Sequence, residues 1–344
     1  MELLIFLLLV VVLYFGLLLI YPFTIISISA AIYLLLLPIC FLHFQKIKKF
    51  QNEILYIQTK NIRKLLAEVS FKIYKKKPKN LIAVTGTNGK TSIADFYYQI
   101  LKLNNKKVTS NKTLLYLHGG GYVACGPETH GALITQLSLI TNCHVVFPIY
   151  RLAPENPFPA AIEDALATYK NLLEVGINAN EIFIAGDSAG GGLTLALLQK
   201  IKSEELPMPS CAIVISPWTD LTLSGNSIQE RGHRDPMIKP GPAMQITVNA
   251  YCGGEDASNP LISPLFADYK DMPPIQIQVA SEETIYDDSS RLYEKLKEEN
   301  PGKVEFIEWK GLFHVFQAFC SGWLAIPEAK KSLKSIAKFV DLYI

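Results

Sequence analysis

Ser188 is the residue whose sequence surroundings point most directly to catalytic chemistry. It is the central residue of GDSAG at positions 186–190, between an apolar run and a helical pattern of apolar residues. In a G-x-S-x-G pattern the serine occupies a strained turn between a strand and a helix. Glycine is needed two positions away on each side, because a side chain there would collide with the neighbouring strand or helix. The pattern therefore predicts a nucleophile for acyl transfer.

Three consecutive glycines at positions 119–121 end another apolar run. Acyl transfer creates a negatively charged oxygen, and backbone N–H groups free of side chains can point together at that oxygen. We expect the N–H groups of Gly119, Gly120 and Ala189 to form this oxyanion hole. His118 is expected to be a structural hydrogen-bonding residue, because it lies beside the hole rather than opposite the serine.

A histidine base is expected downstream of the serine, because chains with this nucleophile turn have the order Ser, then Asp or Glu, then His. Only His233 and His314 follow Ser188. His314 lies just after a predicted strand, in a loop that contains Gly311, which suits a base suspended above a sheet. His233 lies in a polar loop between charged residues and is expected to be solvated or to hold that loop.

The acid that orients the base is expected directly after the predicted strand at 275–280. The carboxylates of that segment are Glu282, Glu283, Asp287 and Asp288. Glu283 is the preferred acid and Asp287 is the second choice. In the predicted reaction His314 removes the proton of Ser188, and water later releases the acyl group. No metal or organic cofactor is needed, and no histidine or cysteine spacing indicates a metal site.

The elements that must position these residues alternate along the chain. The predicted strands cover 113–117, 144–149, 181–185, 211–215, 275–280 and 304–308, and the predicted helices cover 130–141, 159–174, 189–201, 289–300 and 327–342. Strands that alternate with helices indicate an α/β domain built on a mainly parallel sheet. We place this domain at residues 111–344.

The composition argues against nucleic acid as a partner. The 344 residues carry a formal net charge of only +2, and the mean hydropathy of +0.22 points to buried or lipid-facing residues. Six cysteines lie far apart without a CxxC pair, so we expect reduced and mostly buried thiols.

Two apolar runs, at 3–20 and 23–44, contain no charged residue, and each has about the 20 residues that a helix needs to cross a bilayer. We therefore expect a transmembrane hairpin at residues 1–50. Residues 46–79 carry eleven Lys or Arg and two Glu, and positive residues next to a membrane span stay on the cytoplasmic side. The remainder of the chain is accordingly expected on the cytoplasmic side of a membrane.

A second glycine motif, GTNGKT at 86–91, follows a strand-like run and precedes a helical pattern. Backbone N–H groups at such a helix start suit a phosphate, so Gly89, Lys90 and Thr91 are candidate nucleotide-binding residues. The segment 51–110 resembles the start of the ATP-binding domain of Mur peptide ligases. About thirty residues after Lys90 the chain has reached the glycine run at 119–121, which leaves no room for a magnesium-binding carboxylate and the rest of a nucleotide-binding sheet.

Residues from about 113 to the C-terminus resemble the bacterial hormone-sensitive lipase family, also called GDXG lipolytic enzymes. The resemblance rests on HGGG at 118–121, YRLAPE at 150–155, GDSAG at 186–190 and SEETIYDDS at 281–289. It implies an α/β-hydrolase fold, a Ser188–Glu283–His314 triad and hydrolysis of short to medium acyl esters, with a small ester or lipid as substrate. The alternatives are an ATP-dependent ligase-like protein and an inactive, membrane-bound fusion.

Overall fold

The computed structural model describes residues 110–322 and 325–344. The predicted transmembrane hairpin at 1–50 lies outside the described residues, and so does the segment at 51–110 that was predicted to resemble a nucleotide-binding domain, except for residue 110. None of the helices between residues 110 and 344 that the structure describes has the length and apolar character to cross a bilayer.

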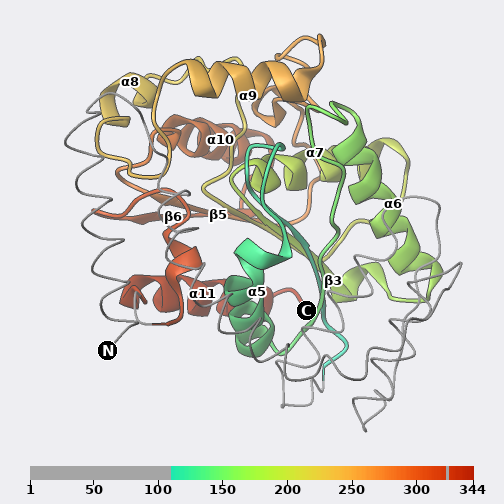
Figure 1. Ribbon diagram of the computed structural model, residues 1–344. Helices are drawn as coiled ribbons and strands as arrows, with labels where there is room; N and C mark the ends of the chain where they lie inside the picture. Colours follow the sequence, from blue (N-terminus) through green and yellow to red (C-terminus); the bar gives the residue numbers. More distant parts are fainter. Residues whose placement is uncertain (1–109, 323–324) are drawn as a thin grey trace, which may run out of the picture. The chain divides into compact units, whose positions relative to one another are not determined.

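Within residues 110–322 and 325–344, six parallel strands form a sheet in the order β2-β1-β3-β4-β5-β6 (Figure 1). The strands are β1 (Thr113–Leu117), β2 (His144–Val146), β3 (Ile182–Asp187), β4 (Cys211–Ile215), β5 (Ile275–Ala280) and β6 (Val304–Trp309). Every residue of β1, β3, β4 and β5 is buried. Continuous burial explains why β1, β3 and β4 are mainly apolar, since a parallel sheet is covered on both faces, whereas β5 also buries Gln276 and Gln278.

Helices cover both faces of the sheet (Figure 1). On one face lie α5 (Pro127–Thr141) and α11 (Pro327–Val340), which pack against each other and enclose one apolar core. The opposite core is formed with α6 (Ala160–Glu174), α7 (Ala189–Ser203) and α10 (Tyr286–Glu299). Shorter elements are α8 (Ser227–Arg231), α9 (Pro242–Cys252), η2 (Ala179–Glu181), η3 (Pro264–Phe266) and η4 (Phe316–Phe319).

The predicted α/β architecture is confirmed, and the strand predictions at 113–117, 211–215 and 275–280 agree with the structure at both ends. The prediction of a strand over 144–149 is too long, because β2 ends at Val146. Helix α10 begins at Tyr286, three residues before its predicted start. Five cysteines are free, of which Cys125 is exposed and the others are buried; Cys40 lies outside the described residues.

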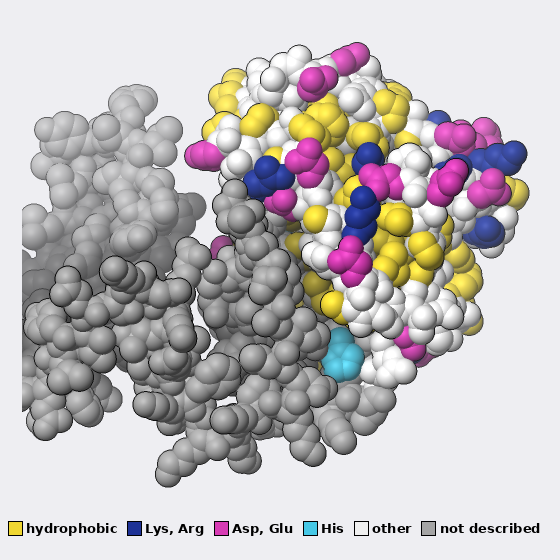
Figure 2. Space-filling model, turned by 90° about the vertical axis from the view of Figure 1, so that its right-hand side faces the viewer, with side chains coloured by type: hydrophobic (Ala, Val, Ile, Leu, Met, Phe, Trp, Pro, Cys, Tyr) yellow, Lys and Arg dark blue, Asp and Glu magenta, His cyan; other side chains and the backbone are white. Residues whose placement is uncertain are grey.

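Charged side chains on the α6 side of the described residues alternate in sign (Figure 2). Arg151 pairs with Asp164 of α6, while Lys170 of α6 and Lys200 of α7 both pair with Glu204. Nucleic-acid-binding surfaces are dominated by Lys and Arg. The basic side chains in these pairs are neutralised locally by carboxylates instead.

Because all six strands are parallel, their carboxyl ends meet at one edge of the sheet, where α/β proteins place their sites. Ser188 follows β3 directly and Ser216 follows β4 directly. Glu283 lies three residues beyond β5, and His314 lies five residues beyond β6. The fold therefore gathers the residues predicted for acyl transfer at the same edge.

Candidate active site

Ser188 lies in the sharp turn between β3 and α7 that its motif predicts. Its backbone has φ 52° and ψ −124°, outside the regions that an L-residue with a side chain normally adopts. Three hydrogen bonds hold it there. Its N–H donates to Ile215 O over 2.9 Å, and its carbonyl accepts from the N–H groups of Gly192 (3.1 Å) and Trp218 (2.9 Å). A strained serine fixed in this way presents its hydroxyl at the end of the strand.

The two flanking glycines are required by close backbone contacts. A Cβ atom on Gly186 would collide with the carbonyl of Gly190, and one on Gly190 would collide with the carbonyls of Leu117 and His118. These contacts confirm the steric reason inferred from the sequence. They also show that the nucleophile turn is packed directly against the end of β1, where the other glycine run begins.

Glu283 and His314 are joined by a hydrogen bond of 3.1 Å between Glu283 Oε2 and His314 Nδ1. Both side chains are buried, Glu283 completely and His314 with 5% of its surface exposed. A carboxylate at Nδ1 selects the tautomer that leaves Nε2 free to accept a proton. The structure thus brings the predicted acid and base together. Within the described residues no hydrogen bond joins Ser188 to His314.

Ser216 connects the acid and the base, and the sequence prediction missed this role. Its hydroxyl donates to Glu283 Oε1 over 2.7 Å and accepts from the N–H of Val315 over 3.2 Å. Glu283 Oε1 also accepts from the N–H of Ala280. Its position in the sequence could have indicated this role, because Ser216 directly follows the end of a buried strand, as Ser188 does.

The electrostatic surroundings of His314 favour its protonated form. Burial disfavours the charged imidazolium, but the hydrogen bond and the negative charge of Glu283, together with the charges of Asp235 and Asp187, outweigh burial, so the pKa of His314 is raised above 6.5. Asp235 is itself buried and accepts from the N–H groups of Met237 and Thr284. An imidazole in this setting is a stronger base than one in water.

The amides of residues 119–121, which we call the glycine loop, differ in their hydrogen bonds. The N–H of Gly119 donates to Asp187 Oδ1 over 3.1 Å, so this amide is already committed and does not face a substrate. The amides of Gly120 and Gly121 donate no hydrogen bond in the part of the chain that the structure describes, and both residues have positive φ, 114° and 64°. Sequence spacing does not reveal that the amide of Gly119 is already bonded within the protein.

The two remaining histidine assignments agree with the structure. His118 is buried, its Nδ1 lies 2.7 Å from the carbonyl of Gly119, and burial lowers its pKa to about 4. It is therefore a neutral structural residue. His233 is exposed, and its Nε2 accepts from Arg234 Nε over 3.3 Å. Neither residue is joined to Ser188.

The second-choice acid, Asp287, is held elsewhere. Its Oδ2 accepts from the N–H of Ser227 over 3.0 Å, and its own N–H donates to the hydroxyl of Ser227. These bonds tie the start of α10 to α8. The structure therefore favours Glu283 over Asp287 as the partner of His314.

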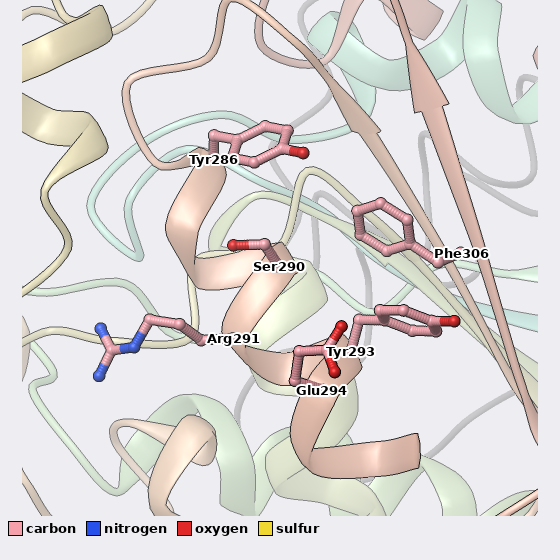
Figure 3. A pocket seen from close by; sticks show the side chains of 6 residues that line it. All are labelled: Tyr286, Ser290, Arg291, Tyr293, Glu294 and Phe306. Carbon is pink, nitrogen blue, oxygen red and sulfur yellow. The ribbon is translucent and has the colours of Figure 1, made fainter.

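A shallow groove lies between α10 and β6, away from these residues (Figure 3). The lining residues are Tyr286, Ser290, Arg291, Tyr293, Glu294 and Phe306. Arg291 at this groove pairs with Asp220 over 2.9 Å. Ser188, Glu283 and His314 do not line it, so we do not assign it to the candidate active site.

Comparison with known proteins agrees with the α/β fold of the described residues. Residues 114–318 match the alpha/beta hydrolase fold family. An acetyl-hydrolase from Streptomyces hygroscopicus is 38% identical over 230 residues, covering 67% of this chain and 75% of that protein. An esterase from Acinetobacter venetianus is 36% identical over 234 residues, covering 68% and 76% respectively. The crystal structure of a hormone-sensitive lipase from a metagenome library superimposes with a TM-score of 0.66 at 40% identity, covering 70% of this chain and 80% of that one.

The chain belongs to the α/β-hydrolase fold family, as its parallel sheet and the match over residues 114–318 show. Its relatives within that fold are esterases and hormone-sensitive lipases, and the chain is a carboxylic ester hydrolase. The resemblance to the hormone-sensitive lipase family is thereby confirmed. The match begins at residue 114, and the predicted nucleotide-binding residues Gly89, Lys90 and Thr91 lie outside the described residues.

Proposed function

We propose that this hydrolase cleaves short acyl esters through a triad of Ser188, Glu283 and His314. The observation that carries the proposal is the buried hydrogen bond between Glu283 and His314, at the sheet edge where Ser188 occupies its strained turn. Catalytic hydrogen bonds are often long before substrate binds, so the lack of a hydrogen bond between the described residues Ser188 and His314 is compatible with this role.

In the proposed reaction His314 Nε2 takes the proton of Ser188 Oγ as the oxygen attacks the ester carbonyl. The negative charge on the carbonyl oxygen is stabilised by the N–H groups of Gly120, Gly121 and Ala189. His314 then donates its proton to the departing alcohol. A water molecule, deprotonated by His314, attacks the acyl group and regenerates Ser188.

The proposed substrates are esters of small acids. The support comes from the names of the relatives, an acetyl-hydrolase and an esterase. A Cβ atom on Gly121 would lie 2.9 Å from Thr247 Cγ2 and 3.9 Å from Trp218 Cζ3, so Thr247 and Trp218 pack against the proposed oxyanion hole.

The test combines hydrolysis with covalent labelling. The purified full chain is assayed on p-nitrophenyl esters from acetate to dodecanoate, and it is then treated with a fluorophosphonate, which reacts with activated serines. We expect the highest kcat/KM for acetate or butyrate and one labelled peptide that contains Ser188. Absence of hydrolysis, or label at another serine, would refute the triad.

The pH dependence of this activity is expected to follow His314. Its neutral form is the base, so activity is lost as the pH falls through its pKa in the folded enzyme. Because that pKa is raised above 6.5, the acid limb of kcat/KM should lie above pH 6.5. The measurement is kcat/KM for p-nitrophenyl acetate between pH 5 and 9 at constant ionic strength. An acid limb well below pH 6.5 would contradict this assignment.

We also propose that residues 1–50 anchor the chain in a membrane as a hairpin, with the hydrolase domain on the cytoplasmic side. The support is two uncharged apolar runs followed by eleven Lys or Arg in residues 46–79. The full chain should stay in the membrane pellet after extraction with alkaline carbonate, and protease should reach the hydrolase domain only from the cytoplasmic face. Recovery in the soluble fraction would refute the anchor.

The alternatives left open by the sequence are less well supported. The match over residues 114–318 to a hydrolase family favours the esterase over the ATP-dependent ligase and over the inactive fusion. If ATP bound to the full chain and Lys90→Ala abolished that binding while Ser188→Ala did not, the ligase-like function would regain support.

A further inference from the structure

Asp187, the residue before Ser188, is a buried carboxylate that takes no part in the proposed proton transfers. Only 2% of its surface is exposed. It accepts hydrogen bonds from the hydroxyl of Tyr116 (2.8 Å), the N–H of Gly119 (3.1 Å) and Nε2 of His130 (3.2 Å). A buried carboxylate is tolerated only where such donors replace water. Its donors come from β1, from the glycine loop and from α5.

The contact with Gly119 links the nucleophile turn to the glycine loop. A Cβ atom on Gly119 would overlap the carboxylate of Asp187, so the carboxylate occupies the space that glycine leaves open. Gly119 is adjacent in sequence to Gly120, and Asp187 is adjacent to Ser188. One carboxylate therefore sets the distance between the proposed nucleophile and the proposed oxyanion donors.

His130 fixes this carboxylate from the opposite side. Its Nε2 faces Asp187, and its Nδ1 lies 2.8 Å from Thr129 Oγ1 and 3.4 Å from the carbonyl of Gly126, at the start of α5. Burial disfavours a charged imidazole here, but the charge and hydrogen bond of Asp187, with the carbonyl of Gly126 and the charge of Glu128, together outweigh burial and raise the pKa of His130. For Asp187 burial favours the neutral acid, yet the charge and hydrogen bond of His130, with the Tyr116 hydroxyl and His118, together outweigh burial and lower the pKa. The two groups thus stabilise each other's charge.

We propose that His130 is a positioning residue for ester hydrolysis. By holding Asp187 as an oriented carboxylate, His130 keeps the N–H of Gly119 bonded and the amides of Gly120 and Gly121 directed at the developing oxyanion. This inference rests on the proposed function and adds to it a residue that never touches the substrate. Loss of His130 removes one hydrogen-bond donor from the buried carboxylate of Asp187. The carboxylate is then free to shift, and the N–H of Gly119 that it holds shifts with it.

The test compares His130→Ala and His130→Gln with the matched control His233→Gln, all in the full chain. For each we would measure kcat and KM for p-nitrophenyl acetate and the inhibition constant of 2,2,2-trifluoroacetophenone, whose adduct with a serine hydroxyl carries an oxyanion. We expect His130→Ala to lower kcat about tenfold and to weaken the inhibitor about tenfold, with KM changed less than twofold, because a displaced oxyanion donor stabilises the transition state less. The kcat and inhibition constant of His130→Gln should lie between those of His130→Ala and the wild type, since the glutamine amide can donate to Asp187. Both quantities should match the wild type in His233→Gln.

Tyr116→Phe serves as a second probe if His130→Ala does not fold, as judged by circular dichroism. It removes another donor from the same carboxylate with the loss of one oxygen atom, and the same parallel loss of kcat and inhibitor affinity is expected. Wild-type kcat and inhibition in the folded variants would overturn the positioning role, as would a lower kcat with unchanged inhibition. A wild-type enzyme that neither hydrolyses the ester nor binds the ketone would instead refute the proposed function and, with it, this inference.

Discussion

Ser188→Ala is expected to lower kcat/KM for p-nitrophenyl acetate by about 10⁴-fold or more, since a site without its nucleophile retains only oxyanion stabilisation and substrate binding. KM should change little, because the hydroxyl acts on the bound ester. The variant should also lose all fluorophosphonate label. Its thermal unfolding should stay close to that of the wild type, since relief of the strained backbone is not expected from alanine.

Ser290→Ala is the matched control for this variant. Ser290 lies on α10 in the groove remote from the candidate site, so its loss should leave both hydrolysis and labelling unchanged. If Ser188→Ala kept more than a few per cent of the wild-type rate, another nucleophile would have to be sought, and the strained turn at β3 would need a different explanation.

Glu283→Gln is expected to reduce kcat by about 10³- to 10⁴-fold with little change in size. The amide can present an N–H to His314 Nδ1 in place of a carboxylate oxygen, so the imidazole would turn its proton toward Ser188 instead of accepting one. Loss of the negative charge should also lower the pKa of His314 and move the acid limb of any residual activity to lower pH. Kinetics at several pH values would measure both effects.

Asp287→Asn tests the second-choice acid in the same assay. Asp287 is bonded to Ser227 and not to His314, so this variant should retain nearly full kcat and lose only some stability through the link between α8 and α10. A larger loss of activity for Asp287→Asn than for Glu283→Gln would reverse the assignment of the acid.

The strands and the edge at which the site lies were predictable because their signals are local. The run that became β4 is apolar from end to end and is bounded by Ser210 and Ser216, and β1 is apolar after Thr113, so burial of these strands on both faces could be inferred directly. The motif around Ser188 predicts a sharp turn between a strand and a helix, because only glycine fits at positions 186 and 190.

Helix α9 illustrates what the sequence does not contain. The middle of this helix, Ile246-Thr247-Val248, consists of β-branched residues that favour strands. The segment is therefore absent from the predicted helices. Helix formation there is set by packing, in which Thr247 lies against the glycine loop. Tertiary contacts override local propensity at this point, and a sequence pattern cannot report them.

The same limit applies to Asp187 and Ser216. Asp187 stands at a variable position of the G-x-S-x-G pattern, and its donors His130 and Tyr116 lie 57 and 71 residues away along the chain. Ser216 lies 67 residues from Glu283 and 99 from Val315. Hydrogen bonds over such separations depend on how the strands are ordered in the sheet, which became known only with the fold.

The place of β6 has a consequence for how the enzyme fails on warming. It is the last strand in the sheet order, it pairs with β5 alone among the described strands, and most of its residues are partly exposed. Strands in such places fray at temperatures where the central ones still hold. Because His314 follows this strand, turnover should vanish in a local opening while the far-ultraviolet spectrum still looks native, and an acyl group trapped on the enzyme should delay that loss.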